Sequence, residues 1–339
     1  MRRIHWAGCL LALLTLGLGP WDNAVAEPTC RPEVIRQPTQ RGLWVDGETS
    51  GFDPCHASVQ WRVPAGTGPF PVVLSIHGGG GRKDAQAITD AFHAAGYATL
   101  IFDAYAMNGF ARTPRLANAT RQAMLFKIGE QAIRWLQQRP DVDAQRLFLY
   151  GISNGASVVL NLAALPAPHR VQAVFSEAPT PVGMGLPDVL RSPVRVAFGQ
   201  EDDLGAPVGK KRWEIAENCR VVVKAPGAPP GTADRCSQSQ GSGTMLTSLE
   251  WAKQLKLEDR GALDVVYFPG VAHGAFLGPL RQQTWAEFLQ SKGAPTQPFM
   301  ARIGWSEGGT EAGRQALLQN ALLFYKQWGG LGPRSAPPN

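Results

Sequence analysis

A serine between two glycines stands in the stretch of this chain most suited to chemistry. Residues 151–155 read Gly-Ile-Ser-Asn-Gly. An apolar run of strand length precedes them at 146–150, and helix-forming residues follow at 156–165. A Gly-x-Ser-x-Gly between a strand and a helix makes a tight turn that exposes the serine hydroxyl. The pattern predicts that Ser153 is a nucleophile; the alternative is that it only caps the helix.

A serine hydroxyl is a weak nucleophile at neutral pH, so Ser153 needs a histidine base that a carboxylate orients. With this kind of turn the chain order is serine, acid, histidine. His273 follows an apolar run at 263–268 and is the expected base. His169 also lies downstream, but two nearby prolines indicate a surface loop there. The alternative for His273 is a structural histidine in a turn.

Three carboxylates follow the apolar run at 194–198, in the sequence Gly199-Gln-Glu-Asp-Asp203. A carboxylate at this point would hold the imidazole tautomer and stabilise the imidazolium. We expect Asp202 in this role, because the loop after such a strand usually turns back toward the histidine there. Asp203 is the second choice and Glu201 the third.

A tetrahedral intermediate on Ser153 needs N–H donors for its oxyanion. The backbone N–H of Asn154, the residue after the serine, is the first expected donor. The second should come from the run His77-Gly-Gly-Gly-Gly81, which follows an apolar stretch at 72–76. The sequence therefore predicts an oxyanion hole built from two backbone segments.

Within the glycine run, Gly79 is the favoured donor, and Gly78 and Gly80 are alternatives. Glycine lets the backbone approach a ligand closely and aim its N–H groups inward. His77 is expected to shape the loop rather than to act as a base. A flexible turn and a phosphate cradle are the other interpretations, although no Gly-Lys-Ser/Thr follows, as a Walker loop would require.

Residues near the expected strand ends are candidates for substrate binding. Tyr105 and Phe276 could line an apolar pocket, although either could equally be core packing. Trp213 is better interpreted as packing. Glu177 follows the run at 171–176 and could bind a substrate amine, but a solvated or ion-paired loop residue is the preferred interpretation.

Apolar, β-branched runs alternate with helical stretches along the chain. This alternation predicts an α/β fold, a mostly parallel sheet with helices on both faces, whose ligands bind at the carboxyl ends of the strands. The expected strands are 59–63, 72–76, 98–102, 146–150, 171–176, 194–198 and 263–268, and the expected helices are 84–95, 120–139, 156–165 and 313–328.

Residues 1–26 have the pattern of a signal peptide. Two arginines precede an apolar stretch at 9–18 that is too short to span a bilayer, and Ala-Val-Ala precedes Glu27. We expect an exported protein, secreted or periplasmic, with one domain over 27–329. A loop around 205–262 is expected as an insertion, and 330–339 as a disordered tail.

The cysteines left after cleavage are even in number, which in an oxidising compartment favours disulfides. Proximity in the sequence favours Cys30–Cys55 and Cys219–Cys236 among the three connectivities. A zinc site is a weaker alternative, because the chain has no Cys-x-x-Cys and no closely spaced His/Cys pair.

The composition is that of a globular protein. Of the 339 residues 44% are hydrophobic and 18% charged, and the formal charge is +6. No run of lysines or arginines concentrates that charge, so we do not expect nucleic-acid binding. No segment after residue 26 is long and apolar enough for a transmembrane helix, so we expect no membrane anchor after cleavage. The composition does not determine the oligomeric state.

Four stretches of the chain resemble the α/β-hydrolase superfamily, and within it the dienelactone hydrolase-like branch. They are 71–78, 96–103, 199–203 and the Tyr-x-Pro-Gly-x-x-His pattern at 267–273. The resemblance covers roughly Val59 to Phe276 and implies the acid at Asp202 and the base at His273. The founding members of that branch use a cysteine nucleophile, where this chain has Ser153.

The resemblance and the residues together predict a secreted serine hydrolase that cleaves carboxylic esters through an acyl-enzyme. Its substrate would be a small-molecule or polymeric ester, and no metal or organic cofactor is required. A serine peptidase or amidase on the same fold is the first alternative. A hydrolase-like scaffold that only binds a ligand is the second.

Overall fold

The computed structural model of the protein describes residues 51–110, 116–180, 183–204 and 251–329. The expected signal peptide, the tail at 330–339, Trp213 and most of the expected insertion lie outside these ranges. So do the cysteines other than Cys55, and both disulfide pairings therefore stay predictions.

Within the described ranges, the core of the fold is a seven-stranded sheet in the order β1-β3-β2-β4-β5-β7-β9. The first strand pairs antiparallel with β3, and the other pairs are parallel. This confirms the predicted α/β fold with a mostly parallel sheet. The strands are β1 (Gln60–Arg62), β2 (Phe70–Ile76), β3 (Ala98–Ile101), β4 (Val142–Ile152), β5 (Ala173–Glu177), β7 (Pro193–Gly199) and β9 (Ala262–Phe268).

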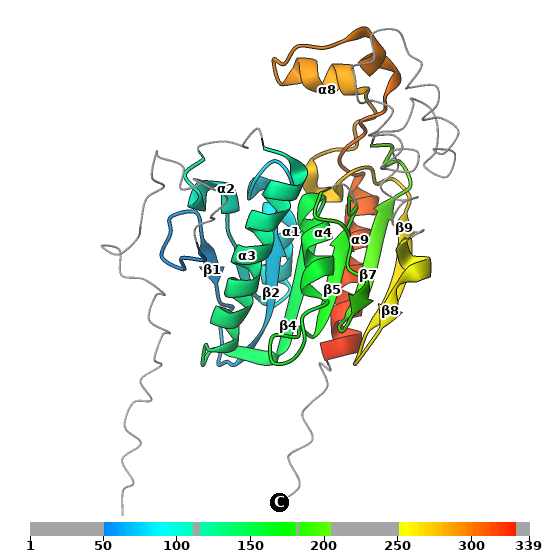
Figure 1. Ribbon diagram of the computed structural model, residues 1–339. Coiled ribbons are helices and arrows are strands. Elements are labelled where there is room, and N and C mark those ends of the chain that lie inside the picture. The colour runs from blue at the N-terminus through cyan, green and yellow to red at the C-terminus, as the bar shows by residue number, and fades with distance from the viewer. Residues whose placement is uncertain (1–50, 111–115, 181–182, 205–250, 330–339) are drawn as a thin grey trace, which may run out of the picture.

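Helices cover both faces of this sheet (Figure 1). One apolar core contains side chains of α3 (Asn118–Gln137) and α4 (Asn154–Leu162). A second core contains side chains of α1 (Lys83–Ala94) and α9 (Glu311–Gly329). Successive residues of a strand point to opposite faces, so the neighbours Leu147 and Phe148 of β4 enter different cores.

The predicted elements are present, but some bounds differ. The apolar run at 146–150 covers only part of β4, which begins at Val142 and includes two exposed residues. An apolar run in the sequence predicts the buried part of a strand but not the part that is exposed to solvent. Short elements also escaped prediction: α2 (Ala104–Met107), β6 (Val189–Leu190), β8 (Lys256–Leu257) and η3 (Ala275–Leu277).

Residues 278–310, which we call the C-terminal excursion, connect η3 to α9 and lie outside the sheet. The C-terminal excursion contains α8 (Trp285–Ser291) and η4 (Pro298–Arg302), and α8 projects beyond one edge of the main body (Figure 1). Phe299 and Ile303 form its small core. None of the helices in the described part of the chain is both long and apolar enough to cross a membrane.

Candidate active site

Ser153 occupies a strained turn between β4 and α4. Its φ of 56° and ψ of −117° are unusual for a residue other than glycine. A Cβ on Gly151 would lie 2.4 Å from Gly155 O, and a Cβ on Gly155 would lie 2.2 Å from Ile76 O. Both flanking positions therefore require glycine. The Ser153 side chain makes no capping hydrogen bond to α4, which argues against the helix-cap alternative.

His273 lies in the segment between β9 and α9 that we call the histidine loop, residues 269–277. Its Nδ1 is 3.1 Å from Oδ2 of Asp202. The His273 side chain is 8% exposed and the Asp202 side chain is fully buried. An ionised carboxylate only accepts hydrogen bonds, so Nδ1 carries the proton and Nε2 is left as the basic nitrogen.

The two neighbouring carboxylates bind elsewhere. Oε1 and Oε2 of Glu201 accept hydrogen bonds from the N–H groups of Gly270 and Val271, at 3.0 and 3.1 Å. Oδ1 of Asp203 accepts from Ser306 N, at 2.7 Å, and so ties the returning end of the C-terminal excursion. Consecutive acidic residues thus hold the start of the histidine loop, its imidazole and the excursion.

The glycine loop, residues 77–81, follows β2 and is fixed by the His77 ring. Nε2 of His77 accepts from Ala104 N at 3.0 Å, so Nδ1 carries the proton and donates to Gly78 O at 2.7 Å. Tyr105 OH donates to the same carbonyl at 3.4 Å. The C=O and the following N–H of a trans peptide point in opposite directions. The Gly79 N–H therefore points away from His77 and Tyr105.

The glycine loop lies directly beside the serine turn. A Cβ on Gly78 would be 3.3 Å from the Cβ of Ser153, and a Cβ on Gly79 would be 3.6 Å from Nδ2 of Asn154. The Asn154 amide group itself is held by Gln122, whose Nε2 donates to Oδ1 at 3.2 Å. The two backbone segments expected to supply oxyanion donors are thus adjacent.

Two aspartates that the sequence reasoning missed support the glycine loop. Oδ2 of Asp84 accepts from Gly80 N at 2.6 Å, and Oδ2 of Asp103 accepts from Arg82 N at 3.1 Å. Burial raises the pKa of Asp84. Burial also acts to raise the pKa of Asp103, but His77 and three backbone N–H groups outweigh it, and the net shift is downward. Asp103 directly follows the predicted strand at 98–102, and that position was the signal that could have found it.

The histidine loop also contacts the serine turn. A Cβ on Gly274 would lie 2.6 Å from Cδ1 of Ile152, so the residue after His273 packs against the residue before Ser153. Gly274 itself has a φ of 69°, which favours glycine at this position. The fold therefore brings the predicted nucleophile, base and acid to one edge of the sheet.

Two of the three candidates for substrate binding are buried. Glu177 is 1% exposed, its Oε1 accepts from Ala275 N at 2.5 Å, and its Oε2 accepts from Tyr150 OH. Tyr105 is 2% exposed and packs edge-on against the His77 ring, with centroids 4.8 Å apart. We correct both candidate roles: each side chain points into the protein, and its polar atoms hold backbone and side-chain groups of the fold. The preferred interpretation of Glu177 as a solvated or ion-paired loop residue is also wrong, whereas the core-packing alternative fits Tyr105.

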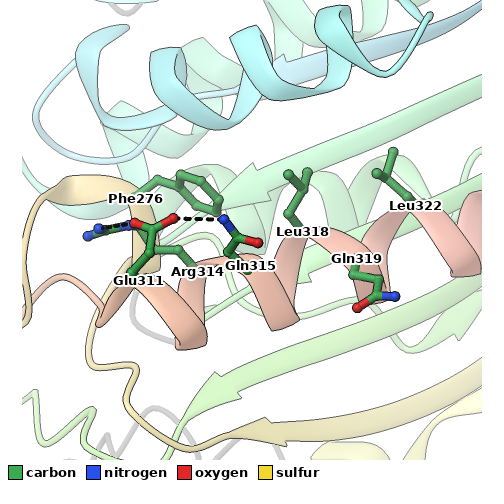
Figure 2. A pocket seen from close by; sticks show the side chains of 7 residues that line it. All are labelled: Phe276, Glu311, Arg314, Gln315, Leu318, Gln319 and Leu322. Carbon is green, nitrogen blue, oxygen red and sulfur yellow. Dashed lines mark hydrogen bonds and ion pairs between the residues drawn. The ribbon is translucent and has the colours of Figure 1, made fainter.

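Phe276, the third residue expected to contact substrate, lies on the wall of an open hollow beside α9. The hollow has a volume of about 460 Å³. Three of its polar side chains bind one another: Glu311 accepts hydrogen bonds from Arg314 at 2.7 Å and Gln315 at 2.8 Å (Figure 2). A role for Phe276 in substrate binding stays a prediction. The lining residues are Phe276, Glu311, Arg314, Gln315, Leu318, Gln319 and Leu322.

Residues 59–218 match the model of the Dienelactone hydrolase family. This stretch includes the glycine loop, Ser153 and Asp202, and ends before His273.

Individual proteins are also similar to this chain. An uncharacterized 31.7 kDa protein in the traX-finO intergenic region of Escherichia coli is 29% identical over 122 residues, 35% of this chain and 41% of that protein. The chain thus spans less than half of that relative's length.

Two solved structures are similar in fold. A dienelactone hydrolase from Anabaena variabilis has a TM-score of 0.45 at 17% identity, over 80% of this chain and 91% of that one. A thermophilic esterase from Thermogutta terrifontis, with propionate bound, has a TM-score of 0.47 at 16% identity, over 82% and 91%.

Proposed function

We propose that this chain, whose residues 59–218 match the model of the Dienelactone hydrolase family, hydrolyses carboxylic esters through an acyl-enzyme on Ser153. The hydrogen bond between the buried His273 and Asp202 carries this proposal. It fixes the imidazole tautomer that a general base needs, next to a serine held in a nucleophile turn. Asp202 is the proposed acid rather than Asp203 or Glu201, because its carboxylate contacts the imidazole.

In the first half of the reaction, Ser153 Oγ attacks the ester carbonyl carbon and passes its proton to Nε2 of His273. The resulting imidazolium is stabilised by Asp202 and gives that proton to the leaving alkoxide, so the alcohol departs and the acyl group stays on the serine. In the second half, water gives a proton to His273 and attacks the acyl carbon. The carboxylic acid leaves and Ser153 regains its proton.

The negative oxygen of each tetrahedral intermediate needs fixed donors. We assign this role to the backbone N–H groups of Asn154 and Gly79. The assignment is supported by the clamp on Gly78 O, since a carbonyl held by His77 and Tyr105 leaves the next N–H pointing the other way. The helix α4 that begins after Ser153 adds the positive end of its dipole.

A fluorophosphonate probe and a short-chain p-nitrophenyl ester test the proposal. The protein should cleave the ester and be labelled by the probe at Ser153, and Ser153→Ala should lose both properties with a nearly unchanged melting temperature. Labelling at another residue, or an active Ser153→Ala variant, would contradict the acyl-enzyme on Ser153. A folded wild type with neither property would favour a scaffold that only binds ligand.

The structure does not support the sequence feature that favoured the peptidase alternative. Glu177 was the candidate anchor for a substrate amine, and both its carboxylate oxygens accept hydrogen bonds inside the fold. We therefore expect p-nitroanilide peptides to be poor substrates beside p-nitrophenyl esters. The natural ester, small or polymeric, is to be found with an ester panel.

We also propose that the protein is exported and cleaved near Glu27, and that it carries the disulfides Cys30–Cys55 and Cys219–Cys236. The support is the pattern of residues 1–26 and the even cysteine count of the remainder. Intact mass of the exported protein would locate the cleavage. Peptide mapping without reduction would identify the pairs.

A further inference from the structure

Glu177 contacts both the serine turn and the histidine loop. Its backbone carbonyl accepts a hydrogen bond from Ser153 N at 3.0 Å. Its Oε1 accepts one from Ala275 N, two residues after His273, at 2.5 Å. A single residue therefore joins the segment that carries the proposed nucleophile to the segment that carries the proposed base.

The position of Glu177 in the sheet explains this reach. Glu177 is the last residue of β5, at the carboxyl edge. The hydroxyl of the preceding Ser176 donates to Ala156 O of α4. Alternate side chains of a strand face opposite sides, so the Glu177 side chain faces the side on which η3 packs against α1. Ala178 then adopts a φ of 51°, which turns the chain away at once.

The carboxylate is enclosed by the fold. Ala275 and Tyr150 are fully buried, and Tyr150 OH donates to the second carboxylate oxygen. Removing the carboxylate would leave the Ala275 N–H and the Tyr150 hydroxyl without this acceptor. Burial raises the pKa of Glu177; the hydrogen bonds from Tyr150 and Ala275 and the charge of His273 oppose this shift, and Asp202 adds to it.

We propose that Glu177 is a positioning residue that fixes the histidine loop against the serine turn during catalysis. This inference rests on the proposed ester hydrolysis. A base displaced by about 1 Å from its working geometry can cost on the order of 10²-fold in rate. Because Glu177 is beneath the site and contacts no reacting atom, the effect should appear in kcat more than in KM.

Three variants of Glu177 test separately the length of its side chain and its charge. Glu177→Gln keeps the length and an acceptor oxygen for Ala275 N–H but removes the charge. Glu177→Asp keeps the charge but is one methylene shorter, and Glu177→Ala removes both. With p-nitrophenyl acetate, we expect the Asp and Ala variants to lose roughly 10- to 100-fold in kcat, and the Gln variant to stay within about threefold of wild type.

A control variant shows what loss of a buried hydrogen bond does on its own. Ser192 is fully buried at the other end of the sheet, where its hydroxyl donates to Val171 O at 2.9 Å. Ser192→Ala should lower the melting temperature while kcat stays within about twofold. If Glu177→Ala does not fold, the contrast between the Gln and Asp variants still decides.

Two results would overturn the inference in the presence of an active wild type. The first is an Asp or Ala variant with unchanged kcat. The second is a Gln variant as impaired as Glu177→Ala, since charge and not reach would then matter. A folded wild type that neither cleaves the ester nor reacts with the fluorophosphonate would overturn the proposed function, and this inference with it.

Discussion

The glycine loop and the histidine loop follow strands on opposite sides of β4, and they are held in different ways. Asp84 and Asp103 hold the glycine loop from 4 and 21 positions away in the sequence, and Ala104 binds its histidine from 27. The histidine loop is held by Glu201, Asp202 and Glu177, from 69 to 98 positions away. The glycine loop is a nearly local structure, whereas the histidine loop takes its position only when distant strands meet.

This difference has an energetic consequence. Groups close in sequence need little loop closure to meet, whereas the contacts of the histidine loop form only after β5, β7 and β9 pair. Damage to the glycine loop should therefore weaken oxyanion binding locally. Damage to the carboxylates under the histidine loop should displace the base.

The largest expected effect is at the serine between the two loops. Ser153→Ala should reduce kcat by more than about 10⁴-fold, because no other hydroxyl takes its position. Ser153→Gly should be equally inactive yet more stable than Ser153→Ala, by up to about 1–3 kcal/mol, since glycine adopts a positive φ without strain. Denaturant unfolding of the two variants measures this difference. An alanine variant as stable as the glycine variant would argue against strain at this turn.

The next effect compares neighbouring carboxylates of one loop. Asp202→Asn should reduce kcat by about 10⁴-fold, because the amide no longer holds the required tautomer of His273. Asp203→Asn should cost less than about tenfold, since Asp203 binds Ser306 N of the C-terminal excursion. Steady-state kinetics with one ester measures both. Equal losses would mean that the acid has been assigned to the wrong residue.

A smaller effect is expected from the clamp on Gly78 O. His77→Ala should lower kcat by about 10²-fold, the usual cost of one oxyanion donor, because Gly79 N–H loses its orientation. Tyr105→Phe should cost only a few-fold, since its hydrogen bond to the carbonyl is long, at 3.4 Å. Melting curves control for loss of folding. A Tyr105→Phe variant as impaired as His77→Ala would contradict this ranking.

The smallest effects are on stability. Glu177, which holds the histidine loop, and Asp103, which supports the glycine loop, should contribute stabilities with opposite pH dependence. Burial raises the pKa of Glu177 above 4.5, so its carboxyl stabilises the fold at low pH and this contribution is lost as pH rises. The pKa of Asp103 is lowered below 3.8, so its contribution is present above that pH and is lost as pH falls.

Unfolding of Glu177→Gln and Asp103→Asn across a pH series tests this contrast. Relative to wild type, the melting temperature of Glu177→Gln should rise with pH above about 4.5. That of Asp103→Asn should fall as pH rises toward about 3.8 and stay level above it, because wild type gains the Asp103 contribution over that lower range. Parallel curves for the two variants would contradict the opposite shifts.

Much of the fold could be predicted from the sequence, because buried strands in a parallel sheet are continuous apolar runs. The runs at 72–76 and 194–198 fall inside β2 and β7. The C-terminal excursion escaped prediction, since its helix is short and its core contains few residues. Its packing depends on contacts with the histidine loop, such as Ala272 N to Gly308 O at 2.8 Å.

The sequence by itself determined the turn around Ser153, because glycines at 151 and 155 and the strand–helix pattern are local properties. It also limited the candidate acids to three consecutive residues and favoured His273 as the candidate base. Only the tertiary structure decided that Asp202 faces the imidazole, and that Glu177 points inward rather than toward a substrate. The physical reason is that the direction of a side chain at the end of a strand depends on which distant segment packs against it, and local sequence does not encode that partner.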